Sequence, residues 1–436
     1  MALGPGVVTD AAVPMPAVSG GRLRALMVLA LAMLAGMVAR TLLSPVQELA
    51  KADMGLSDNQ MGLIQGMALA LPVAVLAVPI GRLVDRTRRV TLLLALSALW
   101  ISGTVLSGLA WDFASLFVGR MLVGLGAAGA VPAILSLTAD LSTPERRGRA
   151  VMVMVIGQAA GMAAAFAGGG ALVGTLAPVA GLPLGLTAWR ATMLLVALMM
   201  LAPTALLVWQ AEPARQEGTT DARPEVPPRL GPALAELWRL RRLVAPLMAG
   251  MITVNMGDAA ATVWAVPVLT RSFGLQPADF GGWMGVLLGL SGAGGTVLGG
   301  LVADWGHKRN AKGGILWGAL GGAALSVPAA LFALAPGVPL FALLLALLMV
   351  AGAIVAVGVA SAITLLVPNH LRGLCLGLMS ALGVFISLGL APSIVSLLAQ
   401  AFGGEEHLPL ALALEGAVAS LVGVLTFRRA LRAARS

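Results

Sequence analysis

The segment Gly81-Arg82-Leu83-Val84-Asp85-Arg86-Thr87-Arg88-Arg89 follows an apolar run and carries a glycine, an aspartate four residues later and then a basic cluster. A second copy, Gly300-Leu301-Val302-Ala303-Asp304-Trp305-Gly306-His307-Lys308-Arg309, repeats that glycine, aspartate and basic residue in register. The copies lie 219 residues apart in a chain of 436, and the match extends back without a gap. The earlier matching glycines are Gly55, Gly62 and Gly66 with Gly274, Gly281 and Gly285. This repetition predicts two related halves.

The composition indicates a membrane protein. Hydrophobic residues make up 59% of the chain, charged residues only 11%, and the mean hydropathy is +0.95. A soluble protein would be about one quarter charged. The net charge of +9 lies in short clusters between apolar runs, which argues against a nucleic-acid partner.

Apolar runs of about 20 residues predict twelve membrane-spanning helices in an all-α integral membrane protein. They lie near 24–47, 58–82, 90–109, 113–138, 150–174, 188–209, 243–270, 279–303, 313–335, 338–367, 372–400 and 408–428. The repeat divides them into two pseudo-symmetric six-helix bundles, with a central site between the halves. The expected domains are a disordered tail at 1–20, a bundle at 21–209, a linker at 210–242 and a bundle at 243–436.

The distribution of Lys and Arg predicts the orientation. Of 28 such residues, 23 lie at the termini or in alternate loops that share their side. Lys51, Arg190 and Arg271 lie on the opposite side, and Arg40 and Arg120 fall inside spans. The positive-inside rule therefore places both termini and the linker in the cytoplasm. The composition suits the inner membrane of a bacterium.

The repeated segment resembles the signature loop of the major facilitator superfamily. Residues 117–128, 139–150 and 54–60 further resemble that superfamily's spinster-like branch, which includes carriers of sphingoid and lysophospholipid amphiphiles. The resemblance implies the major facilitator fold and a gating role for the repeated segment. The gating residues would be Gly81, Asp85, Arg86, Arg89, Gly300, Asp304 and Lys308. Glycine would permit close helix contact, and the charged groups would hold one conformation closed. Ordinary positive-inside charges would explain the arginines but not the repeated spacing.

Two carboxylates of the spinster-like pattern are missing. Ala39 precedes Arg40 where that branch has an aspartate, and Ala127 with Ala128 stands where it has a glutamate. The resemblance assigns both carboxylates to proton coupling, so this mechanism is open to question here. Under the 219-residue shift Asp258 matches Ala39, which makes Asp258 the candidate coupling residue.

Charged residues inside spans need a partner or a function, because each costs about 2.5–3.5 kcal/mol to insert. We predict that Arg40 and Arg120 bind an anionic group of the substrate, since a guanidinium stays protonated and binds phosphate or carboxylate in two places. Arg120 could instead brace helices through backbone carbonyls. Asp258 would respond to protons or pair with an arginine. Glu415, on a peripheral helix, is expected to reach the surface.

The further predicted lining residues are Asn255, Trp264, Gln65, Gln158 and Thr262. No cofactor, metal site or enzymatic activity is expected, because the chain has no catalytic triad, metal-ligand spacing or nucleotide-binding loop. The predicted function is alternating-access transport of an amphiphilic anion that resembles a lysophospholipid or a sphingoid, by a monomer surrounded by membrane lipid. The alternatives are a proton-coupled drug or organic-anion transporter and a non-transporting receptor.

Overall fold

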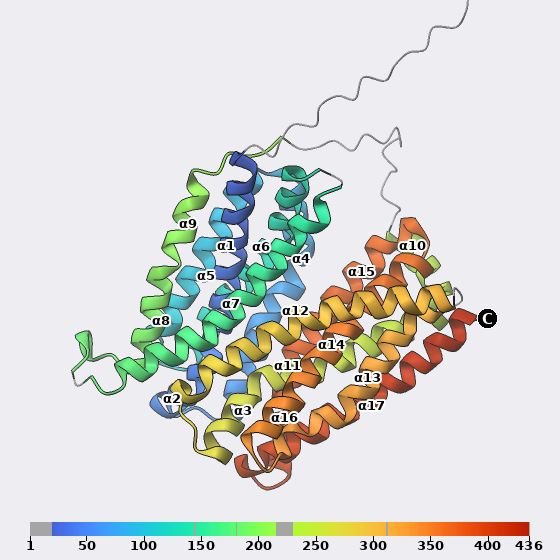
Figure 1. Cartoon of the computed structure of the whole chain (residues 1–436). Helices are drawn as coiled ribbons and strands as arrows, with labels where there is room; N and C mark the ends of the chain where they lie inside the picture. The colour runs from blue at the N-terminus through green and yellow to red at the C-terminus, as the bar shows by residue number, and fades with distance from the viewer. Residues whose placement is uncertain (1–19, 144, 180, 215–229, 311–312, 436) are drawn as a thin grey trace, which may run out of the picture.

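The computed structural model describes residues 20–143, 145–179, 181–214, 230–310 and 313–435 (Figure 1). This part of the chain is built from helices, and twelve of them are long and apolar enough to cross a membrane. The predicted all-α fold of twelve spans is therefore confirmed. Residues 1–19 of the predicted tail and residues 215–229 of the predicted linker at 210–242 lie outside the described residues.

The first six spans run from α1 to α9 and form the blue-to-green half of the molecule (Figure 1). Several of them consist of two or three consecutive helical segments. The bounds are α1 Gly20–Thr41, α2 Leu43–Met54, α3 Asp58–Gly62, η1 Leu63–Met67, α4 Ala68–Arg86, α5 Arg89–Gly108, α6 Phe113–Leu141, α7 Arg147–Leu176, η2 Pro183–Gly185, α8 Ala188–Met199 and α9 Leu201–Val208.

The yellow-to-red half begins with a short helix, α10, before its own six spans (Figure 1). Its bounds are α10 Leu230–Arg239, α11 Arg241–Phe273, α12 Pro277–Arg309, η3 Gly314–Leu316, α13 Trp317–Ala329, η4 Ala330–Leu334, α14 Val338–Leu366, α15 Asn369–Gly383, η5 Val384–Leu390, α16 Ala391–Ala401, η6 Glu405–His407 and α17 Leu408–Arg435. The end of the bundle where α4, α6 and α12 finish carries the basic clusters, and we call it the basic end. The opposite end is the far end.

The prediction that the repeated segments are loops is wrong. Helix α4 continues to Arg86 and α12 to Arg309, so most of the proposed gating residues lie in final helical turns. An added Cβ at Gly81 or Gly300 would meet nothing within 4 Å, so neither glycine makes the expected close helix contact here.

The repeated glycines nearer the far end are the ones that join the two halves. An added Cβ at Gly66 of η1 would lie 2.7 Å from the Leu388 carbonyl oxygen, and one at Gly285 of α12 would lie 2.6 Å from that of Ala163. Backbones can approach this closely only where a side chain is absent. These repeated glycines therefore lie at the two seams, which are the close contacts between the halves: η1 packs against η5, and α7 packs against α12.

Candidate functional site

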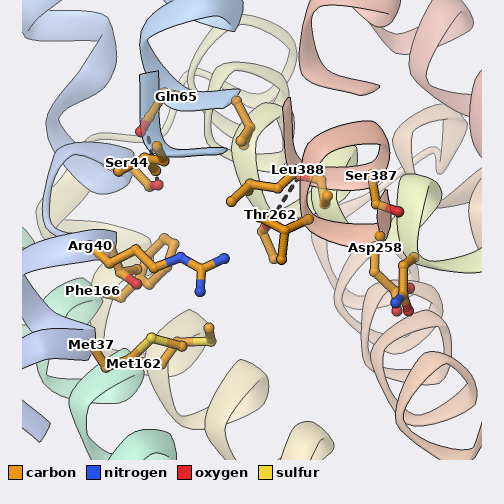
Figure 2. A pocket seen from close by; sticks show the side chains of 17 residues that line it. Met37, Arg40, Ser44, Gln65, Met162, Phe166, Asp258, Thr262, Ser387 and Leu388 are labelled. Carbon is orange, nitrogen blue, oxygen red and sulfur yellow. Dashed lines mark hydrogen bonds between the residues drawn. The ribbon is translucent and has the colours of Figure 1, made fainter. Parts of the chain in front are cut away.

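A polar cavity of about 300 Å³ lies between the halves (Figure 2). Its walls come from α1, α2, η1, α4 and α7 on one side and from α11, α15 and η5 on the other. The lining residues are Met37, Arg40, Thr41, Ser44, Gln65, Leu69, Met162, Phe166, Asn255, Asp258, Ala259, Thr262, Val263, Gly383, Val384, Ser387 and Leu388. Five predicted site residues, Arg40, Gln65, Asn255, Asp258 and Thr262, thus meet in one space.

A second, mainly apolar cavity of about 370 Å³ adjoins it and shares Met37, Arg40 and Val384. Its other lining residues are Ala32, Met33, Gly36, Val73, Ile80, Trp100, Ala127, Ala128, Gly129, Ala130, Val131, Pro132, Ile134, Gln158 and Ser380. These positions lie on the basic-end side of Arg40 along α1, α4 and α6. Gln158, which was predicted to line the substrate site, lies in this second cavity. Ala127 and Ala128, which stand where the spinster-like pattern has a glutamate, leave this wall apolar.

Arg40 stands at the junction of the two cavities. Its side chain extends from α1 toward the opposite half (Figure 2). Within the described part of the chain, its guanidinium makes no hydrogen bond and no ion pair. A partly buried cation without a counter-charge is costly in a membrane protein. The site therefore presents an unneutralised guanidinium to whatever enters.

Arg120 does not line either cavity, contrary to the prediction. It is only 1% exposed, and its guanidinium donates hydrogen bonds to the carbonyl oxygens of Ala39 (3.2 Å) and Arg40 (2.6 Å) and to Gln65 Oε1 (3.3 Å). These carbonyls belong to the last turn of α1, where orphan acceptors carry partial negative charge. The geometry favours the bracing role that the sequence left open.

Two π-helical segments shape the polar cavity, and no sequence pattern predicted them. Segment η1 presents Gln65, which donates to Gln47 Oε1 (3.2 Å) and Ser44 Oγ (3.4 Å), while η5 presents Ser387. Gln47 in turn donates to the Val263 carbonyl oxygen of the other half (2.5 Å). An extra residue per turn re-aims side chains, which explains why such segments occur at functional sites.

Asp258 lines the cavity from α11, on the wall opposite Arg40 (Figure 2). Its Oδ1 is buried and makes no hydrogen bond among the described residues. Gly352 of α14 lies so close that a Cβ there would overlap the carboxylate. Asp258 is thus packed into a recess that only glycine leaves open.

Glu415 of α17 is buried rather than surface-reaching, which corrects the expectation. It is 6% exposed, and neither carboxylate oxygen makes a hydrogen bond in the described structure. It interacts electrostatically with Asp258 on the neighbouring helix. Two carboxyl groups without a basic partner therefore share the interior of the second half.

Trp264 is also absent from the cavity wall. It is fully buried, and its Nε1 donates to the Pro392 carbonyl oxygen of α16 at 2.9 Å. Its indole therefore braces two helices of one half, and the prediction that it lines the cavity is wrong. Nothing in the sequence around Trp264 indicates whether its side chain faces the cavity or the neighbouring helix.

A cluster of ions closes the far end, and we call it the closing cluster. Arg271 of α11 pairs with Glu48 of α2 (2.8 Å) and with Asp58 of α3 (2.7 Å), and Lys51 of α2 pairs with Asp58 (2.7 Å) and with Glu405 of η6. Arg271 also lies 3.7 Å from Glu405 of its own half. The pairs Arg271–Glu48, Arg271–Asp58 and Lys51–Glu405 join the two halves. The sequence did contain a signal for this cluster. Lys51 and Arg271 are basic residues on the side that the positive-inside rule leaves poor in Lys and Arg, and the 219-residue repeat places them one residue apart.

At the basic end, Arg89 serves the first half alone. Its guanidinium pairs with Asp140 of α6 and with Glu212 (3.1 Å), and donates to the Pro213 carbonyl oxygen (3.2 Å). No hydrogen bond or ion pair from Arg86, Asp304 or Lys308 to the opposite half is found in the described structure. These three residues therefore contribute no contact to the predicted gate in the described structure.

A model of the Major Facilitator Superfamily matches residues 29–392, most of the chain. The chain belongs to this superfamily.

Within the described residues, no group of three or more His, Cys, Asp or Glu side chains could hold a metal ion.

Curated relatives of this superfamily member are transporters. It is 27% identical over 294 residues to an MFS-type efflux pump of Mycolicibacterium smegmatis, a match that covers 66% of this chain and 64% of the pump. It is 28% identical over 254 residues to the 3-(3-hydroxy-phenyl)propionate transporter of Escherichia coli, covering 57% of each. Both matches span less than two thirds of the relative's own length.

Solved structures share the fold almost from end to end. A bacterial homologue of the human lysosomal transporter Spinster, in an inward-facing and unoccupied conformation, superposes with a TM-score of 0.80. The match covers 96% of this chain and 98% of that one, at 22% identity. Its inward-facing, occupied form gives a TM-score of 0.75. The predicted superfamily is confirmed, and bacterial Spinster homologues are among the structures that share its fold.

Proposed function

We propose that this member of the superfamily is a secondary transporter for an amphiphilic organic anion. The observation that supports it is the unpaired guanidinium of Arg40 at the junction of a polar and an apolar cavity. Arg40 would bind the carboxylate or phosphate of the substrate, beside Gln65 and Asn255. The apolar body would occupy the second cavity, whose walls offer few hydrogen-bonding groups. A lysophospholipid-like or sphingoid-like molecule has such a charged head group and a separate apolar body.

Alternating access follows from the two ends of the bundle. We propose that the basic end faces the cytoplasm and that the closing cluster seals the opposite side in the present conformation. In the other conformation the cluster would separate, and Gly81, Asp85 and their counterparts Gly300 and Asp304 would come together. A monomer suffices for this cycle, because one chain encloses the whole cavity.

Proton coupling would rest on Asp258 together with Glu415. Arg40 faces Asp258 across the cavity, and Glu415 faces it from α17. Of the other elements packed against α11, the segments α13, α14, α16 and η5 carry no titratable residue, and none of the titratable residues of α2, α10 and α15 lines the cavity. Asp258 and Glu415 are neighbouring carboxyl groups without an ion pair in the described structure, so we propose that this pair exchanges the coupling proton. Ionisation of Asp258 would attract Arg40, and this pair would compete with the anionic substrate.

Two relatives favour a second candidate, a proton-coupled transporter of drugs or small organic anions. One relative is an efflux pump and the other is named for an aromatic carboxylate. A receptor that kept the fold is the third candidate. All three place a ligand in the same cavity, and they differ in its chemistry and in whether solute crosses the membrane.

Thermal unfolding of the purified protein tests the substrate class. A lysophospholipid, 3-phenylpropionate and a cationic drug would each be titrated against the wild type and the Arg40→Gln variant. A ligand at 100 times its Kd stabilises the folded state by about 2.7 kcal/mol. We expect this stabilisation with the lysophospholipid and its loss in the variant. Stabilisation by 3-phenylpropionate or the drug alone would move the assignment to the second candidate.

Flux into proteoliposomes tests transport and its coupling. Uptake of the stabilising ligand should respond to an imposed pH gradient in the wild type. Asp258→Asn should transport without that response, since it can neither bind nor release a proton, and Glu415→Gln should weaken the response. Binding without flux would identify a receptor, and an unchanged pH response in Asp258→Asn would remove this residue from the coupling role.

A further inference from the structure

A basic groove of about 440 Å³ lies at the basic end of the second half, apart from the central cavity. It is formed by α10, the first turns of α11 and the end of α17. The residues that line it are Trp238, Arg241, Arg242, Ala245, Pro246, Ala249, Thr426 and Arg429. Three of the eight are arginines, and none is acidic.

The arginines of the groove offer hydrogen-bond donors to an external anion. Arg241, Arg242 and Arg429 are exposed, and none of them pairs with a carboxylate in the described part of the chain. Arg241 lies over the Trp238 ring, 5.5 Å from its centroid, and donates to the Trp238 carbonyl oxygen at 3.2 Å. This contact holds one guanidinium at the mouth of the groove and leaves its other donors available.

The depth of the groove matches a lipid headgroup. Arg241 is the first residue of the spanning helix α11, and Arg429 lies near the end of the spanning helix α17. Trp238 is 69% exposed, as aromatic side chains are at the membrane surface. Below the arginines, the small residues Ala245 and Ala249 continue the groove along α11 into the apolar span.

We propose that this groove binds the phosphate of an anionic phospholipid, with an acyl chain along Ala245 and Ala249. Guanidinium groups bind phosphate oxygens in pairs, and basic pockets between spanning helices at the membrane surface favour anionic headgroups. Bound lipid would fasten α10, which follows the connection between the halves, to the ends of α11 and α17. The proposal stands on this groove alone and does not depend on what the central cavity carries.

Native mass spectrometry of the whole protein tests this site. Phosphatidylglycerol and phosphatidylcholine would be titrated separately in the same detergent. We expect phosphatidylglycerol to bind at least tenfold more tightly. The Arg242→Gln, Arg429→Gln double variant should lose that preference. The Arg82→Gln, Arg88→Gln double variant should keep it, because it removes the same charge from exposed arginines of the other half at the same end.

Ala245→Trp provides a second test that leaves every charge in place. Its side chain would fill the groove, so phosphatidylglycerol binding should fall about tenfold although all three arginines remain. Equal binding of both lipids by the wild type would overturn the proposal. So would an equal loss in the control variant, which would indicate diffuse surface charge. Displacement by millimolar inorganic phosphate would indicate a site for free anions instead.

Discussion

At the scale of single residues, two arginines inside the spans have opposite surroundings. Arg120 is enclosed by acceptors at the end of α1, whereas Arg40, whose own carbonyl is one of those acceptors, directs its guanidinium into the cavities. The stabilisation of Arg120 comes from bonds within the protein. No bond in the described structure offsets the cost of burying Arg40, which supports the proposal that a ligand does so.

The two arginines should therefore differ in what their loss does to stability. Arg120→Gln leaves carbonyl oxygens of Ala39 and Arg40 without a donor, at about 1–3 kcal/mol for each buried group. Arg40→Gln removes no bond, so its unfolding temperature should stay at or above that of the wild type. Thermal unfolding in one detergent compares them. Equal losses of stability would show that Arg40 also has a structural role.

At the scale of helices, close contact between the halves depends on glycines at defined turns. Helix α4 and the segment η1 before it carry two of the repeated glycines, of which Gly66 touches the backbone of η5 and Gly81 touches nothing. Sequence repetition alone cannot separate them. The conformation decides, because the halves meet at the far end and separate toward the basic end.

Gly66→Ala should weaken the far-end contact, since its Cβ would lie 2.7 Å from the Leu388 carbonyl oxygen, closer than real Cβ contacts allow. Gly81→Ala serves as the control, because its Cβ enters open space. Spin labels at Ala52→Cys and Glu406→Cys, with Cys375→Ala, report the far-end distance. We expect a longer distance in Gly66→Ala alone. An unchanged distribution would mean that the seam tolerates a methyl group.

A second prediction at this scale concerns Glu212, which ties the segment after α9 to the start of α5. Burial by itself raises the pKa of Glu212, but hydrogen bonds from the backbone N–H groups of Val90 and Arg89 and from the Arg89 guanidinium outweigh it, so the pKa is lowered below 4.5. A carboxyl group whose pKa is lower in the folded protein stabilises the fold at any pH above its pKa in the unfolded chain. This stabilisation is lost as the pH falls through the pKa of the folded protein.

Wild-type stability should therefore decline below about pH 4.5 more steeply than that of Glu212→Gln, which lacks this titration. Above that pH the variant should be the less stable of the two, because an amide is a weaker acceptor for Arg89 than a carboxylate. Thermal unfolding between about pH 3.5 and about pH 7 measures both, since this range includes the usual glutamate pKa of about 4.3. Parallel pH curves would contradict the assigned role.

At the scale of the whole molecule, the two halves are held together across the far end by ions that are partly buried. Asp58 is 2% exposed and Arg271 is 24% exposed, so salt screens these pairs less than it would at an open surface. The closing cluster therefore biases the molecule toward the conformation that is open at the basic end. Its strength must stay moderate, because transport requires that it break.

Arg271→Gln should shift the molecule toward the conformation that is open at the far end. Because the pairs are only partly buried, the loss of these charged hydrogen bonds should cost about 1.5–3 kcal/mol, which shifts a balance between two conformations about tenfold to a hundredfold. The Ala52 and Glu406 spin labels should then move apart. Arg190→Gln is the matched control, because Arg190 pairs with Asp53 at the same end but within one half (2.9 Å). Separation in both variants would indicate general loosening instead.

The sequence by itself determined the spans, the duplication and the superfamily. Apolar runs of about 20 residues have few folded solutions other than membrane helices, so hydropathy alone predicts them. The 219-residue repeat likewise matched Asp258 to Ala39, the neighbour of Arg40, and Arg40 and Asp258 line one cavity. These inferences succeed because they depend on properties that hold along the chain.

Only the tertiary structure decided which way individual side chains turn. Arg120 and Trp264 lie on helices that border the site, but each bonds to a backbone carbonyl behind it. Glu415 is held inside by its neighbours, and the gating segments are apart because the halves meet at the far end. Helix rotation, π-helical turns and the choice between two conformations arise from contacts between distant segments. Such contacts form only when the chain folds, and no pattern along the sequence specifies them.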